Sequence, residues 1–290
     1  DVERGAPDGR ALRALATRMP FEALPLVRIA IAVLREEDAI RLHHDERVAH
    51  APSIHRALHL RATTAAMPPL PAPPFPGRKV VLGAPIEVRE LPLCPEMRLY
   101  LLADGVDLHA QVHALLEVET APFWPFAWAG GQVLARYVLD HPETVRGKRV
   151  VDLGAGSGIV AIAAAKVGAK EVVAVDLAEE ALLACQANAA LNGVHLEVST
   201  EMPESFDVLV ASDVLYEKEV ALVIASFEAP GRVLYLGEPR RAAAPELPFA
   251  PVFAHDVRTF PDVDHPISHA SVYRFETPSE WAALREACTR

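Results

Sequence analysis

The feature that most constrains the fold is a glycine loop that follows a short apolar run in the second half of the chain. The apolar run at 150–153 leads into Gly154-Ala-Gly156-Ser-Gly158, and an apolar segment with helical character continues to residue 167. A buried strand that turns through glycines into a helix is typical of nucleotide-binding α/β domains. The sequence therefore predicts a strand, a ligand-binding loop and a helix in this order.

The spacing of the loop distinguishes between ligands. A dinucleotide fingerprint reads G-x-G-x-x-G, whereas the third glycine here comes one position earlier and residue 159 is Ile. Asp152 lies two positions before the first glycine, and Asp176 ends the next expected strand at 171–175. This shorter loop with two flanking acids predicts S-adenosylmethionine (SAM) as the ligand. A nicotinamide dehydrogenase and a purely structural glycine turn are the alternatives.

Each part of the loop has an expected role toward SAM. The glycines let the backbone approach the ligand, and the helix that follows offers N–H groups and a positive dipole end to the methionine carboxylate. Asp152 is expected to hold the methionine ammonium directly or through water, and Asp176 to accept both ribose hydroxyls. Thr200, between Ser199 and Glu201, is a candidate for the adenine amine. The predicted cofactor-binding residues are Trp128, Asp152, Gly154, Ala155, Gly156, Gly158, Asp176, Thr200 and Asp213.

Strands and helices are expected to alternate from residue 149 onward. This alternation predicts an α/β fold with a doubly wound, mostly parallel, Rossmann-like seven-stranded sheet. Residues 249–260 and 269–275 predict a closing antiparallel pair. The other expected strands are 80–90, 98–102, 149–153, 171–175, 194–198, 206–211 and 231–237, and the expected helices are 108–117, 131–139, 157–167, 178–192 and 217–228.

The composition changes along the chain. Residues 1–66 contain ten Arg and no Lys, and we expect them to form an N-terminal extension that is helical or disordered. A Pro-rich linker at 67–78 follows, and Met67 is a candidate for the natural start. Residues 79–277 are expected to form the SAM-binding domain, and 278–290 a C-terminal helical tail.

Charge and cysteine content argue against several classes of function. The formal net charge of −11 lies almost entirely downstream of residue 66, which disfavours a nucleic-acid substrate because phosphates need a basic face. The three cysteines are far apart and form no CxxC pair, so we expect neither a metal site nor a disulfide framework. This cysteine pattern predicts a cytoplasmic location. Apolar runs are too short to span a bilayer, so no membrane partner is expected.

Four blocks of sequence resemble the seven-strand methyltransferases, and specifically the lysine methyltransferases of the electron-transfer flavoprotein β subunit and their bacterial relatives. The resemblance covers residues 85–276 and leaves residues 1–66 unmatched. The blocks are Phe123-Trp124-Pro-Phe-Ala-Trp128-Ala-Gly-Gly-Gln132, Val151-Asp-Leu-Gly154, Ser212-Asp213-Val-Leu-Tyr216-Glu217 and Gly237-Glu238-Pro239-Arg240. The family often has Gly-Asp-Pro where this chain has Gly-Glu-Pro, a departure that bears on target recognition.

The resemblance implies a SAM-dependent N-methyltransferase that acts on lysine side chains of a protein, such as the electron-transfer flavoprotein β subunit or a ribosomal protein. A small-molecule N-methyltransferase on the same fold is the first alternative, and a non-catalytic SAM-binding module is the second. Trp128, before the glycine pair, is expected to cover the methionine end of SAM or to line the acceptor channel.

Lysine methylation requires that the acceptor ammonium first lose a proton, because an exposed lysine is mostly charged near neutral pH. Asp213 ends an expected strand, where such folds place ligands, and can steer the lysine. Tyr216 can orient the amine lone pair. The competing interpretations are a helix cap for Asp213 and core packing for Tyr216. Arg240 and Arg241 are expected to contact acidic groups of a protein substrate or to lie in solvent.

Overall fold

The structure is a computed structural model of the 290-residue chain, and it describes residues 84–103, 122–215, 218–241, 244–262 and 267–289. The expected N-terminal extension, the Pro-rich linker, the expected helix at 108–117 and Tyr216 all lie outside the described residues. No helix within the described ranges has the length and apolar character needed to cross a membrane.

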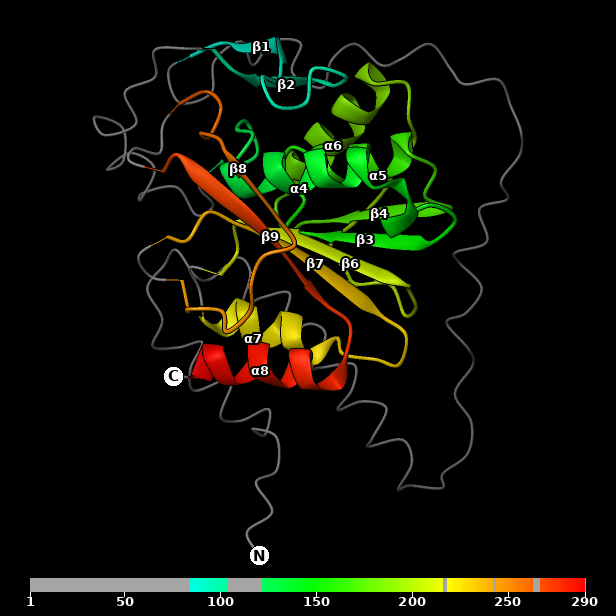
Figure 1. Cartoon of the computed structure of the whole chain (residues 1–290). Coiled ribbons are helices and arrows are strands. Elements are labelled where there is room, and N and C mark those ends of the chain that lie inside the picture. Colours follow the sequence, from blue (N-terminus) through cyan, green and yellow to red (C-terminus); the bar gives the residue numbers. More distant parts are fainter. Residues whose placement is uncertain (1–83, 104–121, 216–217, 242–243, 263–266, 290) are drawn as a thin grey trace, which may run out of the picture.

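A seven-stranded sheet forms the centre of the molecule (Figure 1), and its strands run in the order β5-β4-β3-β6-β7-β9-β8. The five strands from β5 to β7 pair in parallel, and β9 pairs antiparallel with both β7 and β8. The predicted mostly parallel sheet with a closing antiparallel strand is therefore confirmed. Its strands are β3 Arg149–Leu153, β4 Glu171–Val175, β5 Glu197–Ser199, β6 Val208–Ser212, β7 Val233–Glu238, β8 Phe253–Asp256 and β9 His269–Phe275.

Helices cover both faces of this sheet (Figure 1). Helices α4, α5 and α6 lie on one face, and α7 and α8 lie on the other. The expected C-terminal tail is helix α8, whose Trp281 and Leu284 are buried in the same cluster as Ile224 of α7. The helices are α4 Ala129–Asp140, α5 Ile159–Lys166, α6 Glu179–Leu191, α7 Lys218–Ser226 and α8 Pro278–Thr289.

Burial on both faces explains why the central strands are apolar without interruption. In β3, Val150 packs into the cluster under α4 and α5, while Val151 packs into the cluster under α7 and α8. In β6, Val210 and Leu209 divide between the same two clusters. Parallel strands that are covered by helices on both sides have this pattern. Because these strands are parallel, their carboxyl ends meet at one edge of the sheet.

A hairpin outside the main sheet, made of β1 Ile86–Glu90 and β2 Arg98–Leu102, is held against α6 by two asparagines. The Asn188 side chain accepts a hydrogen bond from the Tyr100 amide at 2.7 Å and donates one to the Ser157 carbonyl at 2.8 Å. Asn192 accepts from the amide of Arg98 at 3.1 Å. Asn188 thereby connects the hairpin to the glycine loop.

Several element boundaries differ from those expected, for local reasons. Strand β5 begins at Glu197 rather than 194, because Gly193 has φ 68° and the Val194 amide still bonds the Ala189 carbonyl at the end of α6. Helix α5 begins after Gly158, whose φ of 77° is left-handed. In the described part of the expected strand 80–90, only Ile86–Glu90 is extended as a strand.

Candidate functional site

The glycine loop connects β3 to α5 and is tied to the end of β4. The amides of Gly154 and Ala155 donate to the Val175 carbonyl at 2.9 and 3.1 Å. The Gly156 amide donates to Asp176 Oδ2 at 2.9 Å, and the other carboxylate oxygen of Asp176 accepts from the Ala178 amide at 3.0 Å. Burial raises the pKa of Asp176, and these amide donors oppose the rise. Its side chain is half-buried, so remaining lone pairs can accept ribose hydroxyls.

The loop glycines serve two different purposes. At Gly156, with φ 53°, an added Cβ would meet no atom nearer than 4.0 Å, so the backbone there faces open space. At Gly158 the same atom would lie 3.1 Å from Cys185 Sγ, so this glycine allows α6 to pack closely. Gly154 and Gly156 are partly exposed, whereas Ala155 and Gly158 are buried. The open cradle over Gly156 fits a bound cofactor.

The Asp152 side chain lies in the protein interior and not in the cradle. Its side chain is 2% exposed, and Oδ2 accepts from the Ala161 amide, the third residue of α5, at 2.9 Å. Burial raises the pKa of this carboxyl to about 7, and the Ala161 amide opposes the rise. Asp152 therefore binds one of the N–H groups that a helix start leaves without an intrahelical partner. Its contact with the methionine ammonium stays a prediction.

Asp213 follows β6 with φ 56°, and its amide donates to the Gly237 carbonyl at 2.9 Å. Its Oδ2 accepts from the amide of Gly131, in the first turn of α4, at 2.9 Å. Helix α7 begins only at Lys218, so Asp213 caps α4 across the site and not the helix that follows it. Burial raises the pKa of Asp213 to about 6, opposed by Arg241 and by the glycine amides.

Two glycines bring the start of α4 directly onto the end of β7. A Cβ at Gly130 would lie 2.5 Å from the Gly237 carbonyl oxygen and 2.7 Å from Asp213 Oδ2, and one at Gly237 would overlap the Gly130 carbonyl. Any side chain at either position would push the helix away from the strand. This contact explains the glycine pair after Trp128, and it places the α4 amides against Asp213.

Glu238 is a second buried acid at this end of the sheet, and it is not among the predicted site residues. It is 2% exposed, and its Oε1 accepts from the Arg240 amide at 3.2 Å. Its Oε2 is buried without a hydrogen-bond partner among the described residues. Burial and the neighbouring Asp213 raise the pKa of Glu238 to about 8, with Arg241 opposing. The only sequence signal was its place in the Gly-Glu-Pro block.

Arg241 connects Asp213 to Trp128 at this end of the sheet. A nitrogen of the Arg241 guanidinium lies 3.2 Å from Asp213 Oδ1, and its Cζ lies 5.3 Å from the centre of the Trp128 ring. Trp128 is anchored by Nε1, which donates to the Phe123 carbonyl at 2.9 Å. Arg241 is therefore not a freely solvated side chain, because a buried carboxylate of its own chain attracts it, and its contact with substrate acids stays a prediction.

The remaining residues of interest are exposed, buried against a helix, or outside the described part of the chain. Thr200 is exposed after β5, beside Ser199, whose hydroxyl bonds the backbone of Glu201. Trp124 is 3% exposed and packs with Ala181 and Ala184 of α6. Tyr216 is not among the described residues, so its role stays a prediction.

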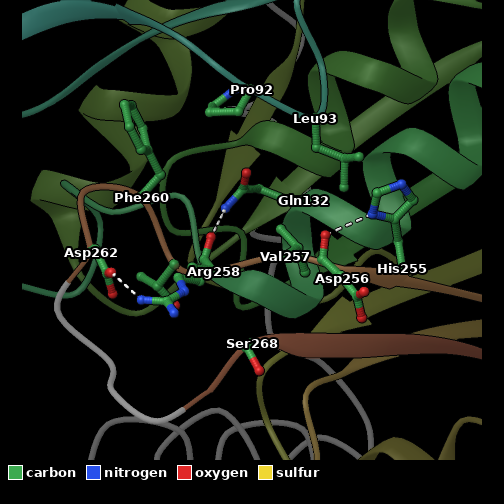
Figure 2. Close-up of a pocket in the computed structure, with 11 residues that line it drawn as sticks. Pro92, Leu93, Gln132, His255, Asp256, Val257, Arg258, Phe260, Asp262 and Ser268 are labelled. Carbon is green, nitrogen blue, oxygen red and sulfur yellow. Dashed lines mark hydrogen bonds and ion pairs between the residues drawn. The ribbon is translucent and has the colours of Figure 1, made fainter.

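A groove of about 650 Å³ lies beside the start of α4 (Figure 2). Gln132 in its wall donates from Nε2 to the carbonyls of Ala127 and Arg258, both at 2.8 Å. These bonds fix the segment before α4 to the loop after β8. The groove contains none of the predicted site residues; it is lined by Pro92, Leu93, Gln132, His255, Asp256, Val257, Arg258, Thr259, Phe260, Asp262 and Ser268.

Known proteins match the part of the chain that builds this site. Residues 134–226 match the family described as ribosomal protein L11 methyltransferase (PrmA). The electron transfer flavoprotein beta subunit lysine methyltransferase of Rattus norvegicus is 35% identical over 160 residues, which are 51% of this chain and 62% of that protein. The enzyme of the same name from Xenopus laevis is 36% identical over 162 residues, 52% of this chain and 65% of that protein.

A bacterial relative matches a shorter part of the chain. The ribosomal protein L11 methyltransferase of Geobacter sulfurreducens is 39% identical over 100 residues, which are 33% of each chain. The chain thus spans less than two thirds of the length of these relatives. Over these segments the chain is similar to both groups of methyltransferases, and its sheet has the mostly parallel, seven-stranded order expected from the sequence, so SAM is the cofactor that this similarity implies.

Proposed function

We propose that the chain is a SAM-dependent methyltransferase that transfers a methyl group to lysine side chains of a protein. The observation that carries this proposal is the pairing of two structures at the same sheet edge. One is the open glycine cradle tied to Asp176, and the other is a buried carboxylate, Asp213, whose partner Arg241 also lies over the Trp128 ring. The carboxyl ends of parallel strands are where such sheets bind ligands.

The cradle fits SAM by its shape and its chemistry. Gly154 and Gly156 would let the backbone approach the methionine portion, and the start of α5 would face its carboxylate. Asp176 would accept the ribose hydroxyls, and the exposed Thr200 would lie toward the adenine. SAM supplies a methyl group on a positively charged sulfur, which a nitrogen lone pair can attack directly. The protein must therefore mainly position the acceptor and exclude water.

The acceptor side has the chemistry that an amine requires. Asp213 is mostly ionised at neutral pH, because its pKa is raised only to about 6. It can accept hydrogen bonds from an approaching lysine while the amine loses its proton. The half-buried face of Trp128 adds a surface that attracts cations. Tyr216, three residues after Asp213, would orient the amine lone pair.

The class of substrate is proposed from the relatives. Their printed names give two protein acceptors, the electron transfer flavoprotein beta subunit and ribosomal protein L11. We propose that this chain also acts on a protein of this kind, in the cytoplasm. Its formal net charge of −11 favours a substrate segment rich in lysine over a nucleic acid.

The test is to incubate the purified chain and SAM carrying a tritiated methyl group with each of the two candidate proteins and, separately, with a cell lysate. The D213N variant serves as the inactive control. We expect label on a lysine residue, located by mass spectrometry. Label confined to small molecules would contradict a protein acceptor, and failure to bind SAM at all would contradict methyl transfer itself.

A further inference from the structure

We propose that Arg241 occupies the position of the substrate's ammonium group in the free enzyme, so that the acceptor site is a preformed site for a primary alkylammonium that Arg241 blocks until it is displaced. This inference deepens the proposed function and depends on it for the identity of the acceptor. The existence of the cation site itself can be tested without any methyl transfer.

The guanidinium of Arg241 already makes the two contacts that an alkylammonium would need. It forms an ion pair with Asp213 at 3.2 Å and lies over the Trp128 ring at 5.3 Å. A carboxylate combined with an aromatic face is a recurring arrangement for binding cations. A positive group therefore fits between these two side chains, since one is found there.

The two walls of this site are fixed by contacts that do not involve Arg241. The Gly131 amide holds Asp213 Oδ2 at 2.9 Å, and the Phe123 carbonyl holds Trp128 Nε1 at the same distance. The Trp128 ring also packs against Phe126, with centroids 5.3 Å apart. Removal of the guanidinium should therefore leave the carboxylate and the ring where they are.

Arg241 is better placed to move than Asp213. Its side chain is 20% exposed, against 8% for Asp213, so it lies on the solvent side of the ion pair. It comes from the loop after β7, where Arg240 has a left-handed φ of 57°. An arginine on such a loop can leave the carboxylate without disturbing the packed strand ends.

The charges at the site make Arg241 and a substrate ammonium exclude each other. Asp213 and Glu238 are both buried acids, and the pKa of Glu238 is raised to about 8, so near neutral pH the pair carries mainly the one negative charge of Asp213. One cation balances this charge. A second cation beside it would meet the repulsion of the guanidinium, whereas exchange of one for the other preserves the balance.

The experiment measures binding of n-butylammonium chloride to the whole chain by calorimetry, at constant ionic strength and about pH 7, where Asp213 is mainly ionised and Glu238 is mainly protonated. R241Q removes the resident charge, and R240Q, which changes the exposed neighbouring arginine, is the matched control. We expect R241Q to bind n-butylammonium about fivefold more tightly than the wild type. This is the change expected if Arg241 fills the cation site of the wild type about four-fifths of the time. R240Q should bind as the wild type does.

Two further measurements separate a cation site from a general loosening of the loop. Binding of n-butanol, which has the same chain without the charge, should be equally weak in the wild type and in R241Q. The double variant D213N/R241Q should lose the gain in n-butylammonium affinity. Thermal unfolding and SAM binding establish that each variant is folded.

Unchanged or weaker binding of n-butylammonium by folded R241Q would overturn the inference, as would a gain that survives in D213N/R241Q. Either result leaves the proposed methyl transfer intact if label still reaches lysine. Conversely, a fivefold gain in n-butylammonium affinity, in a protein that transfers label to no acceptor, would support the cation site and contradict the proposed function.

Discussion

Asp152 and Asp213 are two buried acids in equivalent places, and they differ in what else contacts them. Asp152 lies in β3 and accepts a hydrogen bond from the amide of the third residue of α5. Asp213 follows β6 and accepts one from the amide of the third residue of α4. Asp152 is 2% exposed, whereas Asp213 has a left-handed backbone and an arginine on its second oxygen. The same contact with a helix start thus leaves Asp152 enclosed at β3, whereas Asp213 after β6 keeps a second oxygen paired with a cation.

We propose that the carboxyl edge of the sheet has two separable halves, one for the cofactor and one for the acceptor. The cofactor half consists of the glycine loop, Asp152 and Asp176, whose carboxylates are held by backbone amides. The acceptor half consists of Asp213, Glu238 and Arg241, whose charges act on one another. Damage to one half should therefore leave the ligand of the other half bound.

The largest effect is expected from D213N in the acceptor half. Asparagine can still accept from the Gly131 amide, but it cannot balance an ammonium. Methyl transfer to the lysine acceptor should fall about 10²- to 10³-fold, as when one electrostatic contact to a reacting group is removed. The control is D207N, at the opposite end of β6, where Asp207 pairs with Arg149. If D213N transfers methyl groups at the wild-type rate, Asp213 has no part in the chemistry.

The next largest effect is expected from G156A in the cofactor half. The methyl group would enter the open cradle, and the residue would be strained at φ 53°. The affinity for SAM, measured by calorimetry, should fall about 100-fold, which corresponds to about 3 kcal/mol. G147A places the same strain in a turn with no atom within 4 Å, and should leave SAM affinity unchanged. Equal losses in the two variants would mean that strain, and not the cradle, matters.

The pH dependence of transfer should reveal the acceptor half alone. Asp213 must be ionised to hold the amine, and its pKa is about 6. As pH falls below this value, kcat/KM should therefore fall about tenfold per pH unit. Arg241 lowers the pKa of Asp213, so R241Q should move this acid limb to higher pH. An acid limb in R241Q at the wild-type pH would show that a different group controls it.

The smallest effect is expected on stability, from Asp152. Its pKa is about 7 in the folded protein against 3.8 for an ordinary Asp, so the folded state holds this proton more tightly. That contribution to stability is complete below pH 3.8 and is lost as pH rises toward about 7. D152N does not titrate, so its melting temperature relative to the wild type should rise steadily across this window. A constant difference between the two proteins would exclude the buried ionisation.

The difference between the halves also explains what the sequence could predict. The cofactor half is local: the strand, the glycines and Asp176 lie within one β-α-β unit, so their spacing indicates their geometry. The acceptor half joins the start of α4 to the ends of β6 and β7, which are about 80 to 110 residues further along the chain. Composition gave no sign that Arg241 would turn back to Asp213, or that Gly130 and Gly237 would meet.

The most direct test of the two halves is a calorimetric titration of SAM into D213N. Asp213 contacts α4 and Arg241, whereas the cradle is held by Asp176 and the β4 carbonyls. The dissociation constant for SAM should therefore stay within about threefold of the wild-type value, a change of less than about 0.7 kcal/mol, even though methyl transfer is lost. Loss of SAM binding by a folded D213N protein would contradict the separation of cofactor and acceptor on which the account rests.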